Sequence, residues 1–181
     1  IYVTTMHNTM LFFTEKGRCY WLKCYEIPEG DKNFKGRAIQ NMLNIDPDDS
    51  VNALLRLRGL NDEEFVKSHY VVFATKNGTV KKTSLEAYSR PRTNGVNAIN
   101  IVEGDEVVDV RLTNGKNEII LANRNGRAVR FDEDSIRTMG RVSTGVRGMK
   151  LDEGDDEVVG MIVVNNAETE TVMVVSENGY G

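Results

Sequence analysis

The sequence predicts an all-β protein, a β-pinwheel or propeller-like array of four-stranded blades with about three complete blades and a partial fourth. Three observations predict this fold. One unit, an apolar run followed by a turn ending in glycine and then a mixed basic and apolar run, recurs along the 181 residues. The apolar runs are rich in Val, Ile, Thr, Phe and Tyr, as β-strands are. Helical periodicity is weak, with one candidate window near residues 61–68.

The turn glycines place the hairpins of successive units. They stand at roughly 50- to 60-residue intervals: Gly17, Gly78, Gly126 and Gly179. Asn precedes the last three, and Asn-Gly is the strongest short hairpin signal because both residues accept positive φ. We therefore expect hairpins over residues 10–21, 71–82 and 119–130, and a fourth that begins at residue 172.

Two further markers recur in the same phase as the glycines. The first aligns residues 35–39, 95–99 and 145–149, with Ala38, Ala98 and Gly148 equivalent. The second is an acidic turn, present at residues 103–106 and 152–157. Together they predict one domain over residues 1–181, with approximate blade units 1–50, 51–105, 106–155 and a partial unit 156–181.

Composition excludes several classes of protein. No stretch approaches the roughly 18 apolar residues of a membrane span, so we expect no membrane contact. Two cysteines, Cys19 and Cys24, cannot build a disulfide framework, which favours a cytoplasmic location. The ends of the chain, an apolar run at Ile1 and a turn at Gly181, lead us to expect a piece of a longer protein.

The formal net charge of −4 conceals an alternation of charge along the chain. Residues 76–92, 111–131 and 135–150 each sum to +4, whereas residues 103–109 sum to −4 and residues 152–157 to −5. Because the alternation follows the repeat, stacked units would align their basic segments into a stripe, the footprint of a protein that binds a phosphate backbone. The alternative is that these residues are solvated hairpin tips with salt-bridging neighbours.

The basic segments supply the candidate ligands of double-stranded DNA. These are Lys16, Arg18, Lys35, Arg37, Lys76, Lys81, Lys82, Arg90, Arg92, Arg124, Arg127, Arg130, Arg137, Arg141 and Arg147.

Residue patterns for other chemistry are absent from the sequence. Two cysteines and two histidines, His7 and His69, do not have the number or spacing of a zinc site. The acidic turn at 152–157 has glycine at the third position, where a calcium loop needs a ligand. No nucleophile motif accompanies the histidines. We therefore expect no catalytic residue, metal or cofactor in this chain.

The repeat residues resemble those of a known family. The chain is similar to the C-terminal domain of the A subunit of bacterial DNA gyrase, a six-bladed β-pinwheel. The matching stretches cover residues 35–39, 74–83, 103–106, 139–141, 144–149 and 177–181, and Thr144–Met149 is the most specific. The resemblance implies a non-catalytic module that wraps DNA around its curved edge in support of ATP-dependent negative supercoiling by a DNA topoisomerase, an isomerase.

The resemblance also implies partners and leaves alternatives. The implied partners are double-stranded DNA, the gyrase B subunit and a second gyrase A subunit, with ATP and Mg²⁺ bound elsewhere in the holoenzyme. Gyrase members carry a basic heptapeptide of the form Q-R-R-G-G-R-G in the first blade; it is absent here, and we expect it before Ile1. The alternatives are the corresponding domain of the topoisomerase IV A subunit and a propeller-type protein-interaction domain.

Overall fold

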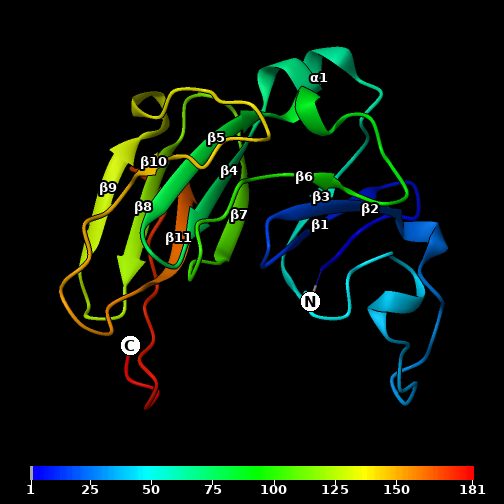
Figure 1. Ribbon diagram of the computed structural model, residues 1–181, viewed down its shortest axis with the longest axis horizontal. Helices are drawn as coiled ribbons and strands as arrows, with labels where there is room; N and C mark the ends of the chain where they lie inside the picture. The colour runs from blue at the N-terminus through cyan, green and yellow to red at the C-terminus, as the bar shows by residue number, and fades with distance from the viewer. Residues whose placement is uncertain (1) are drawn as a thin grey trace.

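The structure, a computed structural model, describes residues 2–181 and contains three antiparallel sheets (Figure 1). Each sheet is built on one of the expected hairpins. The hairpins are β1 (Thr9–Thr14) with β2 (Arg18–Lys23), β4 (Tyr70–Thr75) with β5 (Thr79–Ser84), and β8 (Glu118–Asn123) with β9 (Ala128–Asp132). The predicted all-β, propeller-like fold is confirmed.

A third long strand completes the inner side of each sheet. These strands are β3 (Val51–Leu57), β7 (Val107–Thr113) and β11 (Val158–Val164), which pair with β1, β4 and β8 respectively. The inner strands of neighbouring sheets also contact one another, β3 with β7 and β7 with β11. The sheets therefore fan out from a shared inner side.

The fourth strand of a sheet comes from the next repeat. The short strand β6 (Val96–Asn97) lies in the second repeat yet pairs with β2 of the first sheet, with Cys19 opposite Val96. In the same way β10 (Val146–Arg147), from the third repeat, pairs with β5 of the second sheet. The third sheet has three strands. The sequence marker at 95–99 and 145–149 thus contains a strand exchanged between repeats, which forms the outer edge of the first and second sheets.

The tip glycines explain how an exchanged strand is held. Gly17 has φ of 82°, and its carbonyl accepts the amides of Ala98 (2.8 Å) and Ile99 (3.2 Å). The carbonyl of Gly78 likewise accepts the amides of Gly148 (2.9 Å) and Met149 (3.1 Å). A Cβ on Gly78 would stand 2.6 Å from the carbonyl oxygen of Met149, so the close approach of the two repeats requires glycine there.

The acidic turns have a structural role at the same tips. A side-chain oxygen of Asp105 accepts the amides of Asn77 and Glu106, each at 2.9 Å. Asp49 and Asp156 repeat this arrangement at the other two hairpins. The acidic marker is therefore part of the blade and not only a solvated turn.

The core lies between the sheets because β4 is covered on both faces. Val71 and Phe73 pack toward the first sheet, where the Phe73 ring meets the Phe13 ring edge-on with centroids 5.3 Å apart. Val72 and Ala74 pack toward the third sheet. The outer face of the first sheet is covered by Leu43, Ile45 and other apolar residues of the same repeat.

The residue limits of the sheets differ from those of the approximate blade units drawn from the sequence. The strand β3 falls in the second unit but belongs to the first sheet, and β11 falls in the partial fourth unit but belongs to the third sheet. The fourth hairpin expected from residue 172 does not form: residues 165–181 contain no strand, although Gly179 has a φ like that of the other tip glycines, 82°.

Helical structure is short. The candidate window near 61–68 forms α1 (Glu63–Ser68), whose first turn is capped by Asp62. Single-turn 3-10 helices follow hairpins or loops: η1 (Cys24–Glu26), η2 (Ile39–Asn41), η3 (Leu85–Tyr88) and η4 (Glu133–Ser135). No helix in residues 2–181 is long and apolar enough to cross a membrane.

Candidate nucleic-acid interface

Three equivalent stretches of chain run along the outer edge of the sheets. Each connects the second strand of a hairpin to the inner strand of the same sheet, and we call them the linking segments: residues 24–50, 85–106 and 133–157. The second and third contain the exchanged strands β6 and β10. Equivalent positions in successive linking segments are therefore repeated along the edge.

Most of the predicted basic residues in the linking segments are exposed and carry no ion pair within residues 2–181. Arg141 is half-buried, and the others present their charge to solvent. The set is Lys35 and Arg37 in the first segment, Arg90 and Arg92 in the second, and Arg137, Arg141 and Arg147 in the third.

A basic groove forms where two linking segments meet the first sheet. It has a volume of about 250 Å³ and is lined by Arg18, Arg92 and Arg141, together with residues of β6 and Val142. Arg18 is held in place: its guanidinium donates to the carbonyl of Asn94 at 2.6 Å and to the hydroxyl of Tyr20 at 3.2 Å. Among the described residues, no carboxylate lines the groove. Three arginines from three parts of the chain thus line one groove that has no carboxylate in its lining.

The hairpin tips have the opposite character, because their basic residues are paired. The Lys76 ammonium lies 3.4 Å from the Glu106 carboxylate and 3.3 Å from that of Glu157, and hydrogen bonds to Glu157 and Glu106 raise the pKa of Lys76. Lys16 pairs with Asp48, and Arg124 with Glu157 at 3.6 Å. The alternative interpretation of the charge pattern, salt-bridging hairpin tips, is therefore correct at these positions.

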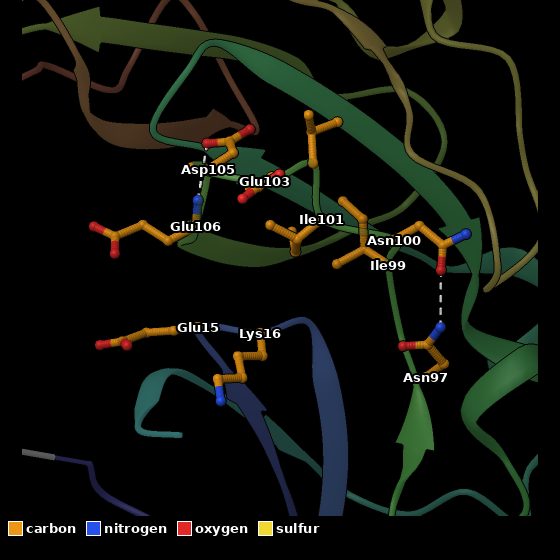
Figure 2. Close-up of a pocket in the computed structure, with 11 residues that line it drawn as sticks. Glu15, Lys16, Asn97, Ile99, Asn100, Ile101, Glu103, Asp105 and Glu106 are labelled. Atoms are coloured by element: carbon orange, nitrogen blue, oxygen red, sulfur yellow. Dashed lines mark hydrogen bonds between the residues drawn. The ribbon is translucent and has the colours of Figure 1, made fainter. Parts of the chain in front are cut away.

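Figure 2 shows the groove beside the tip of the first hairpin, β1–β2. It has a volume of about 440 Å³ and lies between the tip of the β1–β2 hairpin and residues 97–106. Glu15, Glu103 and Glu106 line it, with Lys16 as its basic residue. This acidic groove has the wrong charge for a phosphate backbone, which makes the hairpin tips poor candidates for DNA contact.

The structure corrects the expectation that Lys81 and Lys82 offer their charges to DNA. Both are buried in β5, with 0% and 4% of their surface exposed. Because β5 lies between packed neighbours on both faces, adjacent residues on opposite faces are both covered. Neither ammonium group reaches the surface of the protein.

The two lysines are satisfied internally in different ways. The Lys81 ammonium donates to the carbonyls of Ala98 and Arg141, each at 2.6 Å. Desolvation and the nearby charge of Arg141 lower the pKa of Lys81 to about 7. Lys82 forms a buried ion pair with Glu133 at 3.2 Å, and the same carboxylate accepts from the Thr113 hydroxyl at 2.7 Å.

The remaining predicted residues lie on or beside the edge strand β9. Arg127 pairs with Asp152 at 2.9 Å, and Arg130 pairs with Glu118. Both arginine side chains stay more than half exposed. Exposed ion pairs of this kind are weak, but each places a carboxylate beside the guanidinium and reduces its field.

The list of candidate DNA ligands drawn from the sequence leaves out two basic residues of the linking segments, although the charge pattern includes them. Lys32 and Lys150 lie in the first and third linking segments, are exposed and have no ion pair within the described chain. The signal that finds them is position in a linking segment, and not proximity to a hairpin tip.

Both cysteines of the chain lie inside the protein. Cys19 and Cys24 are both free and buried, and desolvation raises the pKa of the Cys19 thiol well above its usual value. No cluster of three or more His, Cys, Asp or Glu side chains in residues 2–181 could hold a metal ion.

On the inner side, β3, β7 and β11 line a groove of about 680 Å³ that contains Arg56, Asp109 and Arg111.

The fold and its charged edge define a class of protein, the propeller-like arrays of antiparallel blades with a basic outer edge. The family model described as DNA gyrase C-terminal domain, beta-propeller matches residues 8–58, 69–114 and 117–165. These ranges contain all three hairpins and their inner strands. The chain belongs to this family.

Curated relatives agree with the family assignment. The chain is 42% identical over 179 residues to the DNA gyrase A subunit of Salmonella typhimurium, a match that covers 99% of this chain and 20% of the relative. It is 43% identical over 175 residues to the DNA gyrase A subunit of Staphylococcus epidermidis, covering 97% of this chain and 19% of the relative. The chain thus spans about a fifth of the length of these curated relatives.

Two solved structures share the fold. The C-terminal domain of DNA topoisomerase IV superposes with a TM-score of 0.76 at 33% identity, over 89% of this chain and 48% of that one. A DNA gyrase A C-terminal domain superposes with a TM-score of 0.73 at 22% identity, over 90% of this chain and 50% of that one. The second likeness concerns the fold alone.

Proposed function

We propose that this chain binds double-stranded DNA along its outer edge and bends it, as the non-catalytic wrapping module of a gyrase-type topoisomerase. The observation that carries the proposal is the set of unpaired basic side chains in three equivalent linking segments. Two of these segments meet Arg18 of β2 in the basic groove, to which they contribute Arg92 and Arg141. Backbone phosphates suit such an edge because guanidinium groups bind them and release counterions.

The binding is directed at the DNA backbone and not at base sequence. The basic side chains are distributed over three repeats, and among the described elements none lies on one with the dimensions of a recognition helix. Contacts of this kind position the DNA and carry little sequence information. A duplex that follows the edge from one linking segment to the next must curve, and its deformability then sets the preferred sites.

The wider assembly is part of the same proposal. The curated relatives are A subunits of DNA gyrase, so the chain would act beside a second A subunit and the gyrase B subunit in the cytoplasm. We place ATP, Mg²⁺ and strand cleavage in parts of that assembly outside this chain, and we assign this chain no cofactor. Negative supercoiling would then depend on the DNA path that the chain imposes.

Topoisomerase IV remains the second candidate because its C-terminal domain superposes closely and is 33% identical. Gyrase is favoured because the Salmonella gyrase relative is 42% identical over nearly the whole chain. Circle closure in the presence of the protein separates the two: a gyrase-type module wraps DNA with one hand and changes the linking number of the circles. Circles with an unchanged linking number would favour the topoisomerase IV assignment.

A titration with linear duplex at several salt concentrations tests DNA binding. Arg92→Gln combined with Arg141→Gln should weaken binding and make its salt dependence shallower. The magnitude of the negative slope of log K against log salt should fall by about 0.9 for each phosphate that is no longer neutralised. Arg56→Gln combined with Arg111→Gln is the matched control, because it removes two guanidinium groups from the inner groove. Equal effects of the outer and inner changes would contradict the proposed interface.

A further inference from the structure

The buried Lys81 joins two successive linking segments. Its ammonium group donates to the carbonyl of Ala98, directly after β6 in the second linking segment, and to the carbonyl of Arg141 in the third. Both distances are 2.6 Å, which is short for a nitrogen donor. One side chain therefore fixes two stretches of chain that are more than 40 residues apart in the sequence.

The fold itself does not require a charge at this position. The residue three places after the tip glycine is Tyr20 in the first hairpin and Val129 in the third. Tyr20 is buried and Val129 half-buried, and both hairpins form without a lysine. A buried ammonium is costly to desolvate, so its presence in β5 calls for a reason beyond the packing of the sheet.

The two stretches that Lys81 joins both contribute to the basic groove. Arg92, from the second linking segment, and Arg141, from the third, line the groove together with Arg18. The Arg141 backbone is fixed by Lys81, and the next two carbonyls, of Val142 and Ser143, accept from Asn100. The Arg141 side chain thus leaves a backbone whose position is determined from inside the protein.

We propose that Lys81 is a positioning residue for the DNA interface, one that ties the backbone of Arg141 to the second linking segment, which carries Arg92. This inference rests on the proposed DNA-binding function. Lys81 itself does not touch DNA, because the residue is fully buried. It acts through the segment that carries Arg141, and its removal releases that segment and lowers the number of phosphates bound.

The test is a double-mutant cycle on the whole chain. Lys81→Met keeps the aliphatic stem and removes the donor, and Arg141→Gln removes the positioned charge. We expect Lys81→Met to weaken duplex binding by about eightfold at 0.1 M salt for each phosphate released, with a slope lower by about 0.9. The two changes should be strongly non-additive. Lys116→Met, an exposed lysine in the β7–β8 turn, is the charge-matched control and should leave binding unchanged.

Amide hydrogen exchange gives a readout that does not depend on DNA. Exchange in residues 139–145 should accelerate in Lys81→Met while the strands of the third sheet keep their protection. Lys81→Gln, which retains a neutral donor, should give an intermediate loss of affinity and serves if the Met variant does not fold. A purely structural role predicts a changed melting temperature with an unchanged salt slope.

The outcomes separate the inference from the function on which it rests. A wild-type chain that binds no duplex overturns both. Wild-type binding with an unaltered salt slope in Lys81→Met, or additive effects of Lys81→Met and Arg141→Gln, overturns the inference alone. Unchanged amide exchange in residues 139–145 also overturns it, because Lys81 would then not hold the segment.

Discussion

Single residues at the hairpin tips decide how closely two repeats approach. Gly78 and Gly126 share a left-handed backbone, with φ of 86° and 82°. A Cβ on Gly78 would meet the carbonyl oxygen of Met149, whereas a Cβ on Gly126 would meet nothing within 4 Å. The difference arises because Gly78 is covered by the exchanged segment of the next repeat and Gly126 is not.

This pair of glycines gives a matched prediction about stability. Gly126→Ala should cost about 1–2 kcal/mol, the penalty of a left-handed conformation for a residue with a Cβ. Gly78→Ala should cost at least about 1 kcal/mol more, because a backbone carbonyl must also shift. Urea unfolding of both variants measures the two free energies. Equal losses would show that the exchanged segment does not press on the Gly78 tip.

Lys81 gives a prediction about pH. The unfolded chain keeps a proton on this lysine up to about pH 10.4, whereas the folded chain, in which the pKa of Lys81 is about 7, releases it three units earlier. Between these values the unfolded state binds more protons, so raising the pH favours folding. The free energy of unfolding should therefore rise above pH 7, by an amount on the order of a few kcal/mol across the window.

Comparison with Lys81→Met isolates this effect from other titrating groups. Burial raises the pKa of the Cys19 thiol. Above about pH 8.5 that shift lowers the free energy of unfolding as the pH rises, opposite to the effect of Lys81. Unfolding should therefore be followed from pH 7 to about pH 8.5 in both proteins. A wild-type rise that persists unchanged in Lys81→Met would assign the pH dependence to another group.

At the scale of elements, the exchanged strands and the buried ion pair join one repeat to the next. The strands β6 and β10 pair with hairpins of the preceding repeat. The pair between Lys82 of β5 and Glu133 of η4 brings the start of the third linking segment onto the second sheet. Both side chains are almost fully buried, so water has little access to the ion pair.

Breaking this ion pair should destabilise the protein strongly. Lys82→Met should cost about 3–5 kcal/mol, because it leaves the Glu133 carboxylate buried without a counter-charge. The double variant Lys82→Met with Glu133→Gln should recover a large part of that loss, since no charge then remains buried. Chemical denaturation of the single and double variants measures this. A single variant as stable as the wild type would contradict the buried pair.

Three of the four expected hairpins were predicted correctly from sequence, but the exchange between repeats could not be predicted. Tip glycines and strand-forming runs are local signals, and they place β1–β2, β4–β5 and β8–β9 correctly. The exchanged strands are two residues long and pair with a hairpin far away in sequence. No local sequence pattern indicates such a pairing. The marker at 95–99 can therefore be recognised in the sequence, but its pairing with the first hairpin cannot be predicted from it.

The same limit explains what could be predicted of the interface. Charge counting selects Arg90, Arg92 and Arg137, and the structure leaves all three exposed and without an ion pair within the described residues. It also places Lys81 and Lys82 there, because it assumes that a basic residue in a strand faces solvent. A strand packed on both faces violates that assumption, and only the arrangement of sheets shows which strands are so packed.

At the scale of the whole molecule, the array places corresponding residues of successive repeats at equivalent positions. The inner strands β3, β7 and β11 lie against one another in order, and the linking segments are repeated along the outer edge. Paired charges concentrate at the hairpin tips and unpaired charges in the linking segments. A mildly acidic chain therefore presents a basic edge.

The most direct measurement compares two variants that each lose three positive charges. One carries Arg92→Gln, Arg137→Gln and Arg147→Gln in the linking segments; the other carries Lys16→Gln, Lys76→Gln and Arg124→Gln at the tips. Duplex binding is titrated at several salt concentrations. The linking-segment variant should lose up to about 2.7 in the slope of log K against log salt, and the tip variant close to none. A larger loss for the tip variant would contradict a DNA path along the outer edge.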